Sequence, residues 1–333
     1  MKKRVKIVLK WVFLVILFSV LALVLWNQIC KRIDSKLLPN AYGQAVEVNG
    51  KTMVVDIQGE ENETTIILLP GSASASPVLE FLPLAEALSK HYRVITIEPF
   101  GYGLSDTTNT SRDLDTVVNE LHQCVSTLGY DRYYLMAHSL SGLYSLYWAN
   151  TYPEEVLGFI GIDCSVPGQN EENPYPISIT AINKISAYLQ KTQNVLGISR
   201  ALSIGDPKRI IFADFSYDYS EEQLKVYRIL ALDRSYNTTV LNEQDCFDAH
   251  LETVAEMKFP ENLPVLQFVA SSNCEVMAAW EQLHIDVIAE SEFSKVIRVE
   301  GGHYLHFAKK TEIVETVNQW IASLPSKDEP SLP

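Results

Sequence analysis

The chain has 333 residues, of which 47% are hydrophobic and 10% aromatic, and it contains 41 acidic against 27 basic residues. This composition is typical of a globular protein with a packed core. The charge is divided unevenly: residues 1–32 hold seven basic and no acidic residues, so the remainder has 20 basic and 41 acidic residues and a net charge of −21. Such an acidic body is a poor binder of nucleic acid, and we expect no nucleic-acid partner.

The N-terminal segment combines basic residues with an apolar run. Five of the first ten residues are Lys or Arg, and the run Trp11–Trp26 is interrupted only by Ser19. As a helix this run covers roughly 24 Å, and neighbouring apolar residues extend it to about the 30 Å of a bilayer core. Positive charge ahead of the run favours a cytoplasmic N-terminus. The sequence therefore predicts a cytoplasmic tail at 1–10, a membrane anchor at 11–30 and a body on the extracytoplasmic side.

A cleaved signal peptide is the alternative interpretation of this segment. No A-x-A pattern follows the apolar run, and Ile29 is too large for the position before the cysteine of a lipoprotein cleavage site. An uncleaved anchor is therefore favoured, followed by a tether at 31–44.

Short apolar segments alternate with helix-length segments after the tether. This order is typical of a parallel sheet covered by helices. The expected strands are residues 52–57, 64–69, 92–97, 133–137 and 156–162, and the expected helices are residues 78–90, 114–128 and 140–152.

The alternation stops between residues 164 and 263. That segment has helical spacing, and Ser220 with Gln223 matches a capping box at a helix start. The sequence therefore predicts a sheet domain made of 45–163 and 264–324, with a helical cap at 164–263 inserted into it. Residues 325–333 are expected to be a disordered tail. After the cap we expect a strand at 264–270, a helix near 275–289, a strand at 295–299 and a final helix ending near 324.

A serine stands in the turn between a predicted strand and the helix that follows. Ala137 and Ser141 lie two residues on either side of Ser139, which leaves room for the tight turn known as the nucleophile elbow. The turn would direct the backbone N–H of Leu140 toward a developing oxyanion. Ser139 could instead be a helix-capping serine without chemical use. Ser141 is a weaker candidate, because Leu143 would then occupy a position that needs a small residue.

A double glycine and a histidine follow the last predicted strand. The turn at Gly301 and Gly302 lets His303 reach the same edge of the sheet as Ser139. A serine hydroxyl needs a base within hydrogen-bonding distance. We therefore expect His303 to be that base, and His306 to be a surface or core residue.

Four motifs together resemble the α/β-hydrolase fold family, and the resemblance covers residues 45–324. The motifs are LPGSAS at 69–74, EPFGYGLSD at 98–106, AHSLSG at 137–142 and GGHYLHF at 301–307. The resemblance implies a mostly parallel sheet with helices on both faces, and catalysis by Ser, His and an acid without a metal or organic cofactor. It also implies the backbone N–H of Ser72 as a second oxyanion donor.

The acid of the expected triad is where the chain departs from the family pattern. Family members commonly place an Asp where this sequence has Asn273, and an amide cannot offset the charge of an imidazolium. Asp163 ends the strand after the elbow helix, and some relatives, such as certain haloalkane dehalogenases, take their acid from that place. We prefer Asp163, while Glu275 and the absence of any carboxylate remain open.

These residues predict a serine hydrolase that cleaves an ester or related acyl bond of a small to medium, partly apolar molecule. A Ser rather than an Asp at residue 139 argues against the epoxide and haloalkane chemistry of the family. The anchor and five cap aromatics suggest lipid-derived esters: Tyr188, Phe212, Phe215, Tyr217 and Tyr227. The alternatives are a catalytically silent binding or receptor protein on the same fold, which Asn273 would favour, and a membrane-held scaffold for protein partners.

Overall fold

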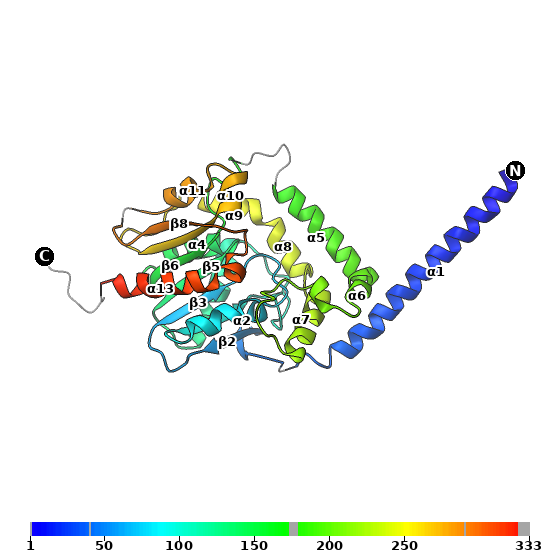
Figure 1. Ribbon diagram of the computed structural model, residues 1–333, viewed down its shortest axis with the longest axis horizontal. Coiled ribbons are helices and arrows are strands. Elements are labelled where there is room, and N and C mark those ends of the chain that lie inside the picture. Colours follow the sequence, from blue (N-terminus) through cyan, green and yellow to red (C-terminus); the bar gives the residue numbers. More distant parts are fainter. Residues whose placement is uncertain (1, 40, 173–178, 290, 326–333) are drawn as a thin grey trace.

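The structure is a computed structural model that describes residues 2–39, 41–172, 179–289 and 291–325 (Figure 1). Within these residues an eight-stranded sheet has the order β1-β2-β4-β3-β5-β6-β7-β8. β2 runs antiparallel to both of its neighbours, and the other neighbouring strands pair in parallel. The strands are β1 (Gln44–Val48), β2 (Lys51–Gln58), β3 (Thr65–Leu69), β4 (Arg93–Glu98), β5 (Tyr133–His138), β6 (Val156–Ile162), β7 (Val265–Ala270) and β8 (Lys295–Val299).

The first strand lies outside the sequence prediction, which began at residue 52. β1 and β2 form a hairpin whose turn consists of Asn49 and Gly50, with φ of 52° and 72°. Two successive left-handed residues make the kind of two-residue turn that Asn-Gly favours. The Asn-Gly pair ahead of an apolar strand is thus a sequence signal for this hairpin.

Helices cover both faces of the sheet, so the parallel strands are buried on each side. In β3, Ile66 and Leu68 belong to one apolar layer, and Ile67 and Leu69 belong to the other. Successive side chains of a strand point to opposite faces, so the run TIILL suits a sheet covered on both sides. One layer contains α2 (Pro77–Leu88), α12 (Leu305–Ala308) and α13 (Lys310–Ser323), and the other contains α3 (Leu114–Thr127) and α4 (Ser141–Thr151).

One predicted helix is divided in two. Within the predicted 275–289 the structure has the shorter α11 (Trp280–Asp286), and the extended residue Met277 separates it from an earlier helix, α10 (Ser271–Val276). The break lets Asn273 and Trp280 both donate to the carboxylate of Asp163. In one straight helix these two donors would lie about 10 Å apart along the axis, too far for a shared acceptor.

Helices between β6 and β7 form a layer beside the sheet domain, in the segment predicted to be a cap (Figure 1). Tyr227 and Leu230 in this layer pack against Leu79 and Leu82 of α2. The predicted capping box at the start of α7 is confirmed. The layer consists of α5 (Ile179–Leu196), α6 (Ile198–Leu202), the 3-10 turn η1 (Pro207–Arg209), α7 (Glu221–Asp233), α8 (Thr238–Asp245) and α9 (Phe247–Val254).

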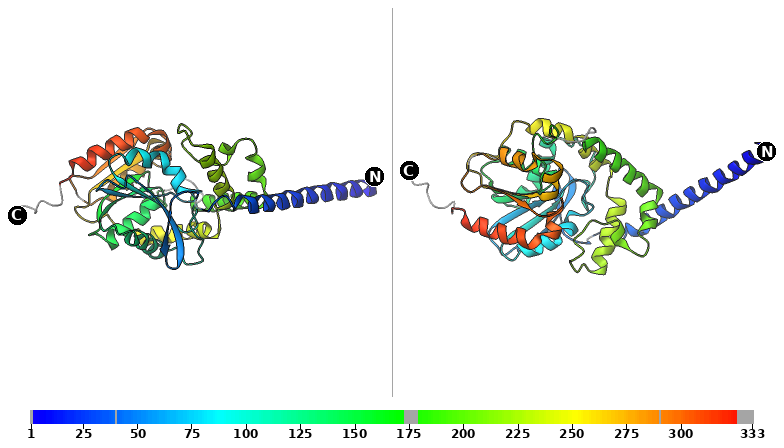
Figure 2. Two further views of the ribbon diagram at one scale, coloured as in Figure 1. Left: turned by 90° about the horizontal axis from the view of Figure 1, so that it is seen from below. Right: turned by 45° about the horizontal axis from the view of Figure 1, so that its top comes forward.

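Helix α1 (Lys2–Asp34) projects away from the rest of the chain (Figure 2). Its residues Arg4–Asp34 are long and apolar enough to cross a membrane, by length and composition, and an 18-residue stretch within them has a mean hydropathy of 2.8. The predicted tether at 31–44 includes the last turn of α1 and also Tyr42, whose hydroxyl donates to Glu98 at 2.8 Å. Of the predicted tail at 325–333, residues 326–333 lie outside the described residues.

Candidate active site

Ser139 lies in a strained turn between β5 and α4. Its φ is 53°, a left-handed conformation that residues other than glycine seldom adopt. Ser141 is buried, and its hydroxyl donates to the carbonyl of Pro70. A Cβ on Gly142 would lie 2.5 Å from Cβ of Cys164, so a glycine is required for α4 to approach the end of β6 this closely. The turn therefore presents the hydroxyl of Ser139, whereas that of Ser141 is already engaged by the backbone.

His303 connects Ser139 to Asp163. Its Nε2 lies 3.0 Å from Oγ of Ser139, and its Nδ1 lies 2.6 Å from Oδ2 of Asp163. Ser139 follows β5, Asp163 follows β6 and His303 follows β8. Parallel strands end at the same edge of a sheet, which is why residues far apart in the sequence meet here. The structure thus brings together the three residues predicted to form a triad, and their catalytic role stays a prediction.

Asp163 is buried and accepts several hydrogen bonds. Its Oδ1 accepts the backbone N–H of Ala270 at 2.8 Å and the indole N–H of Trp280 at 2.9 Å, and its Oδ2 accepts the amide of Asn273 at 2.5 Å. Burial is the largest influence and raises the pKa of this carboxyl, but hydrogen bonds led by that of His303 outweigh it and the pKa is lowered. Asp163 is therefore an ionised acceptor that fixes Nδ1–H of His303, which leaves Nε2 to accept a proton from the serine.

Asn273 and Glu275 take different places around this acid. Asn273 stands where the family commonly has its acid, and here it donates to Asp163. Glu275 is exposed on α10. Because the carboxylate bonded to His303 is that of Asp163, the geometry favours Asp163 over Glu275 and over a site without a carboxylate.

Two cavities, of about 610 and 430 Å³, border both Ser139 and His303. Ser72 borders both of them, and Leu140 borders the smaller one. The two predicted donors of backbone N–H groups therefore stand next to the space in which a substrate carbonyl would bind, as an oxyanion hole requires. Their role as oxyanion donors stays a prediction. The larger cavity extends to α5 and α6 of the cap, and the smaller one extends toward α8, α10 and α11.

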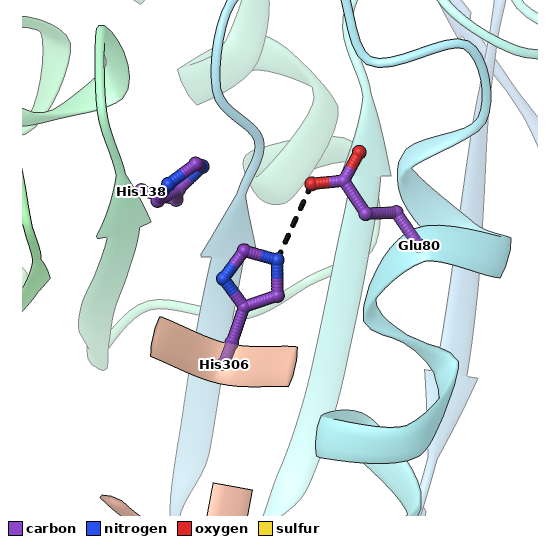
Figure 3. A group of neighbouring side chains, drawn as sticks. All are labelled: Glu80, His138 and His306. Atoms are coloured by element: carbon purple, nitrogen blue, oxygen red, sulfur yellow. Dashed lines mark ion pairs between the residues drawn. The ribbon is translucent and has the colours of Figure 1, made fainter. Parts of the chain in front are cut away.

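A second group of titratable side chains, drawn in Figure 3, includes His138, whose ring centroid lies 4.6 Å from that of His303. Glu80, His138 and His306 are buried, and each offers a ligand atom within 4.8 Å of the others. Nε2 of His306 lies 3.4 Å from Oε1 of Glu80. Burial is the main cause that lowers the pKa of both imidazoles, so they are neutral, which is the form that binds metals. These residues could hold a metal ion such as Zn²⁺, which accepts nitrogen and carboxylate ligands.

Sequence reasoning missed three residues of this region, and it named Asn273 without its role. Asn273 and Trp280 support Asp163, and Glu80 and His138 belong to the buried group. His138 offered a local signal, because it directly precedes the candidate nucleophile. The contacts of the other three join segments that are distant in the sequence, so no local pattern points to them.

Comparisons with known proteins agree with this architecture. A family model described as alpha/beta hydrolase fold matches residues 64–184. The Bacillus subtilis protein named Uncharacterized protein YbdG is 34% identical over 128 residues, which are 38% of this chain and 39% of that protein, so the chain matches less than half of this relative's length.

Two solved structures show the same fold at low identity. An epoxide hydrolase from Vigna radiata is 19% identical, with a TM-score of 0.60 over 85% of this chain and 98% of that chain. A meta-cleavage product hydrolase from Pseudomonas fluorescens is 16% identical, with a TM-score of 0.61 over 85% of this chain and 99% of that chain. The family match includes the elbow, and these neighbours cover both the sheet domain and the cap. The chain therefore has the α/β-hydrolase fold, and its residues 64–184 match that family's model.

Proposed function

We propose that the protein is a serine hydrolase that cleaves an ester or related acyl bond. The observation that carries the proposal is the hydrogen-bonded series in which His303 lies 3.0 Å from Ser139 and 2.6 Å from Asp163. A serine hydroxyl is a weak nucleophile until a base accepts its proton. A carboxylate on the far nitrogen holds that base in the correct tautomer and stabilises the imidazolium that forms.

The proposed reaction proceeds in two halves. Oγ of Ser139 attacks the acyl carbonyl carbon while its proton passes to Nε2 of His303, and the carbonyl electrons move to an oxygen held by the N–H groups of Ser72 and Leu140. When the carbonyl re-forms, the bond to the leaving group breaks and His303 returns the proton to that group. Water then repeats the sequence on the acyl-serine, which releases the acid and restores the hydroxyl of Ser139.

A hydroxyl at residue 139 supports acyl transfer rather than epoxide or haloalkane hydrolysis. A carboxylate that attacks an epoxide or an alkyl halide forms an ester, which water can cleave. The oxygen of Ser139 would form an ether in the same reaction, and an ether has no comparable route to hydrolysis. The likeness to an epoxide hydrolase therefore supports the fold and not that activity.

The cavities support a substrate that is small to medium in size and partly apolar. The larger one is bordered by aromatic side chains, including Phe212, Phe215 and Tyr304, and by the polar Gln190 and Asn194. Cavities of this volume accept molecules of drug size. In the proposal the acyl group and the leaving group lie on opposite sides of Ser139, one in each cavity.

The proposed location is a membrane, with the N-terminus in the cytoplasm and the catalytic body on the other side. The length and hydropathy of α1 support a single span. The basic residues at its start, with no acidic residue before Asp34, support the orientation.

A fluorophosphonate probe tests the proposed chemistry directly. The full-length protein in detergent micelles is expected to be labelled covalently and to hydrolyse members of a panel of carboxylic esters. In S139A labelling is expected to disappear, and the turnover number is expected to fall by about 10⁴-fold or more. S141A is expected to keep the label, because the hydroxyl of Ser141 is bonded to Pro70. A folded protein that neither reacts with the probe nor hydrolyses any ester would contradict the proposal and favour a silent binding protein.

A further inference from the structure

Helix α5 of the cap carries apolar side chains on its outer face. Ile182, Ile185 and Leu189 are spaced three and four residues apart, so they share one side of the helix, and they are 45%, 60% and 58% exposed. This set is termed the α5 stripe. A helix of a protein surrounded by water normally turns such a stripe toward the core. Among the described residues of this chain the α5 stripe is left largely uncovered.

The opposite side of α5 is polar and borders the cavities. Gln190 and Asn194 border the larger cavity, and Asn183 and Lys184 border the smaller one. The helix thus places polar groups toward the substrate space and aliphatic groups away from the protein. This inverse pattern suits a helix that separates a wet cavity from lipid.

A buried asparagine joins the end of α5 to α1. Asn27 is 1% exposed, and its Nδ2 donates to the backbone carbonyls of Asn194 at 2.9 Å and Val195 at 3.3 Å. The last carbonyls of a helix have no partner within the helix, so Asn27 supplies donors that α5 lacks. Nε of Arg200 donates to Oδ1 of Asn27 at 2.8 Å. A Cβ on Gly197 would lie 2.8 Å from Cβ of Asn27, so the two backbones approach closely.

Charged groups fix the same junction. Arg200 is buried and forms ion pairs with Asp34 at the end of α1 and with Asp233 at the end of α7, and Lys31 lies 3.4 Å from Asp233. The anchor helix and the cap are therefore packed against each other. Figures 1 and 2 show that α5 meets α1 with its C-terminal end and at a steep angle, on the side of the molecule toward which α1 projects.

We propose that the α5 stripe lies on the bilayer that α1 crosses, and that the enzyme takes single-chain lipid esters from this bilayer into the cavity beneath α5. The substrate part of this inference rests on the proposed function. The predicted anchor at 11–30 covers about 30 Å, the thickness of a hydrocarbon core, so Asn27 lies in its last turn, close to the level at which α1 leaves the lipid. Because Asn27 holds the end of α5, that helix lies at the membrane surface with its aliphatic side toward the lipid.

A bilayer fits this surface better than a second copy of the chain does. α1 is exposed all around from Val5 to Leu21, so it requires an apolar medium of its own beside the cap. The same medium covers the α5 stripe without any further partner. A lipid ester entering beside α5 would meet the polar Gln190 and Asn194 with its head group and the aromatic lining of the larger cavity with its chain.

The position of the stripe can be measured with a nitroxide label on the full-length protein in phospholipid bilayers. The label is attached to I185C, and I285C on α11 is the matched control, since Ile285 is a 44% exposed aliphatic residue of the sheet domain. Unsubstituted protein treated in the same way gives the background from native cysteines. Collisions with oxygen, which concentrates in lipid, are expected to exceed those with a water-soluble nickel chelate at residue 185 and not at residue 285. Water-like access at residue 185 would overturn the proposal, and so would low access to both reagents, which would indicate a protein contact.

The substrate part is tested with the charged variant I185E/L189E in bilayers that contain a monoacylglycerol. Turnover of this lipid ester is expected to fall about tenfold or more, because carboxylates lift α5 from the lipid, while a water-soluble short-chain ester is hydrolysed as before. I285E is expected to change neither rate. Unchanged turnover of the lipid ester in I185E/L189E would overturn the inference. If the unsubstituted protein hydrolyses neither ester, the proposed function fails, and the nitroxide measurement still decides where the stripe lies.

Discussion

Two regions of the molecule bury opposite kinds of side chain. One is the edge of the sheet at Ser139, and the other is helix α5 of the cap. At the sheet edge the polar group is the exception: Asp163 is 0% exposed, accepts four hydrogen bonds and lies among aliphatic strands. On α5 the polar Gln190 and Asn194 border the larger cavity, while the apolar side chains of the α5 stripe are exposed. The first pattern is that of a protein surrounded by water, in which buried polar groups are paired. The second pattern is the basis for our proposal that this face lies on lipid.

The two regions are also held in place by different means. The triad residues stand at strand ends, and the hydrogen bonds of the parallel sheet determine their relative positions. The end of α5 depends on Asn27, which is 167 positions away from Asn194 in the sequence. The first arrangement is intrinsic to the sheet domain, whereas the second requires α1 to be present.

Loss of the charge on Asp163 is expected to have the largest effect on kcat. It tests the paired polar groups at the edge of the sheet. D163N replaces an ionised acceptor with an amide that no longer selects the tautomer of His303, so kcat for a soluble ester is expected to fall about 10⁴-fold. Steady-state kinetics measure the loss, and thermal unfolding checks that the fold is kept.

E275Q is the matched control, since it removes the exposed carboxylate considered as an alternative acid. Its kcat is expected to stay within about twofold of the unsubstituted value, as is usual for an exposed position away from the site. Activity that survives in D163N but is lost in E275Q would mean that the acid has been assigned to the wrong residue.

Replacing Arg200 tests whether its contacts with α1 and α7 hold the end of α5 in place. R200M keeps a long apolar side chain but removes the guanidinium that contacts Asn27, Asp34 and Asp233. Removing one partner of a buried ion pair costs about 3 kcal/mol or more, and because the two Asp side chains are partly exposed we expect about 2 kcal/mol. Hydrogen exchange of backbone amides at the end of α5 and in α6 is then expected to be about 30-fold faster in detergent micelles.

R298M is the control for this change, because Arg298 is exposed on β8. Its effect on the free energy of unfolding is expected to stay within about 0.5 kcal/mol. If the end of α5 remained equally protected in R200M, the junction with α1 would not be what holds the cap, and the inference about the membrane-facing stripe would lose its main support.

Acid should weaken the sheet domain, because its interior holds neutral imidazoles. Burial lowers the folded-state pKa of His138 and His306 below the unfolded value of about 6.5. Below that pH the unfolded chain binds protons that the folded chain does not, so these groups stabilise the fold above about pH 6.5 and this stability is lost as the pH falls. The free energy of unfolding is expected to drop by up to about 1.4 kcal/mol per pH unit for each group.

Thermal unfolding between neutral and acid pH measures this dependence. H306Q removes one of these groups and is expected to make the decline shallower, although His250 and His284, whose pKa burial also lowers, still contribute to it. H91Q, at an exposed position, should leave the decline unchanged. An identical acid dependence in H306Q and the unsubstituted protein would show that His306 does not contribute.

Much of the architecture could be predicted because it depends on local patterns. The alternation of apolar strands and helices predicts the parallel sheet, and the α/β-hydrolase fold is confirmed. The small residues around Ser139 and the double glycine before His303 are backbone requirements that can be read in a few neighbouring positions. Their meeting at 3.0 Å follows from the shared edge of the strands.

Other features could not be predicted because they join segments that carry no matching pattern. Nothing near Asn273 or Trp280 indicates that a helix breaks between them so that both reach Asp163. The apolar spacing of α5 by itself would predict a stripe facing the core, and only the packed chain turns it outward.

The local order of the amino acids is enough to define the sheet, the elbow and the helix that can cross a membrane, because periodicity and turn chemistry act over a few residues. The packing of distant segments decides which carboxylate reaches His303. It also decides that Asn27 forms hydrogen bonds with the end of α5. Such contacts are decided by the shape and hydrogen bonding of the whole fold, since each polar group that becomes buried must find its partner there.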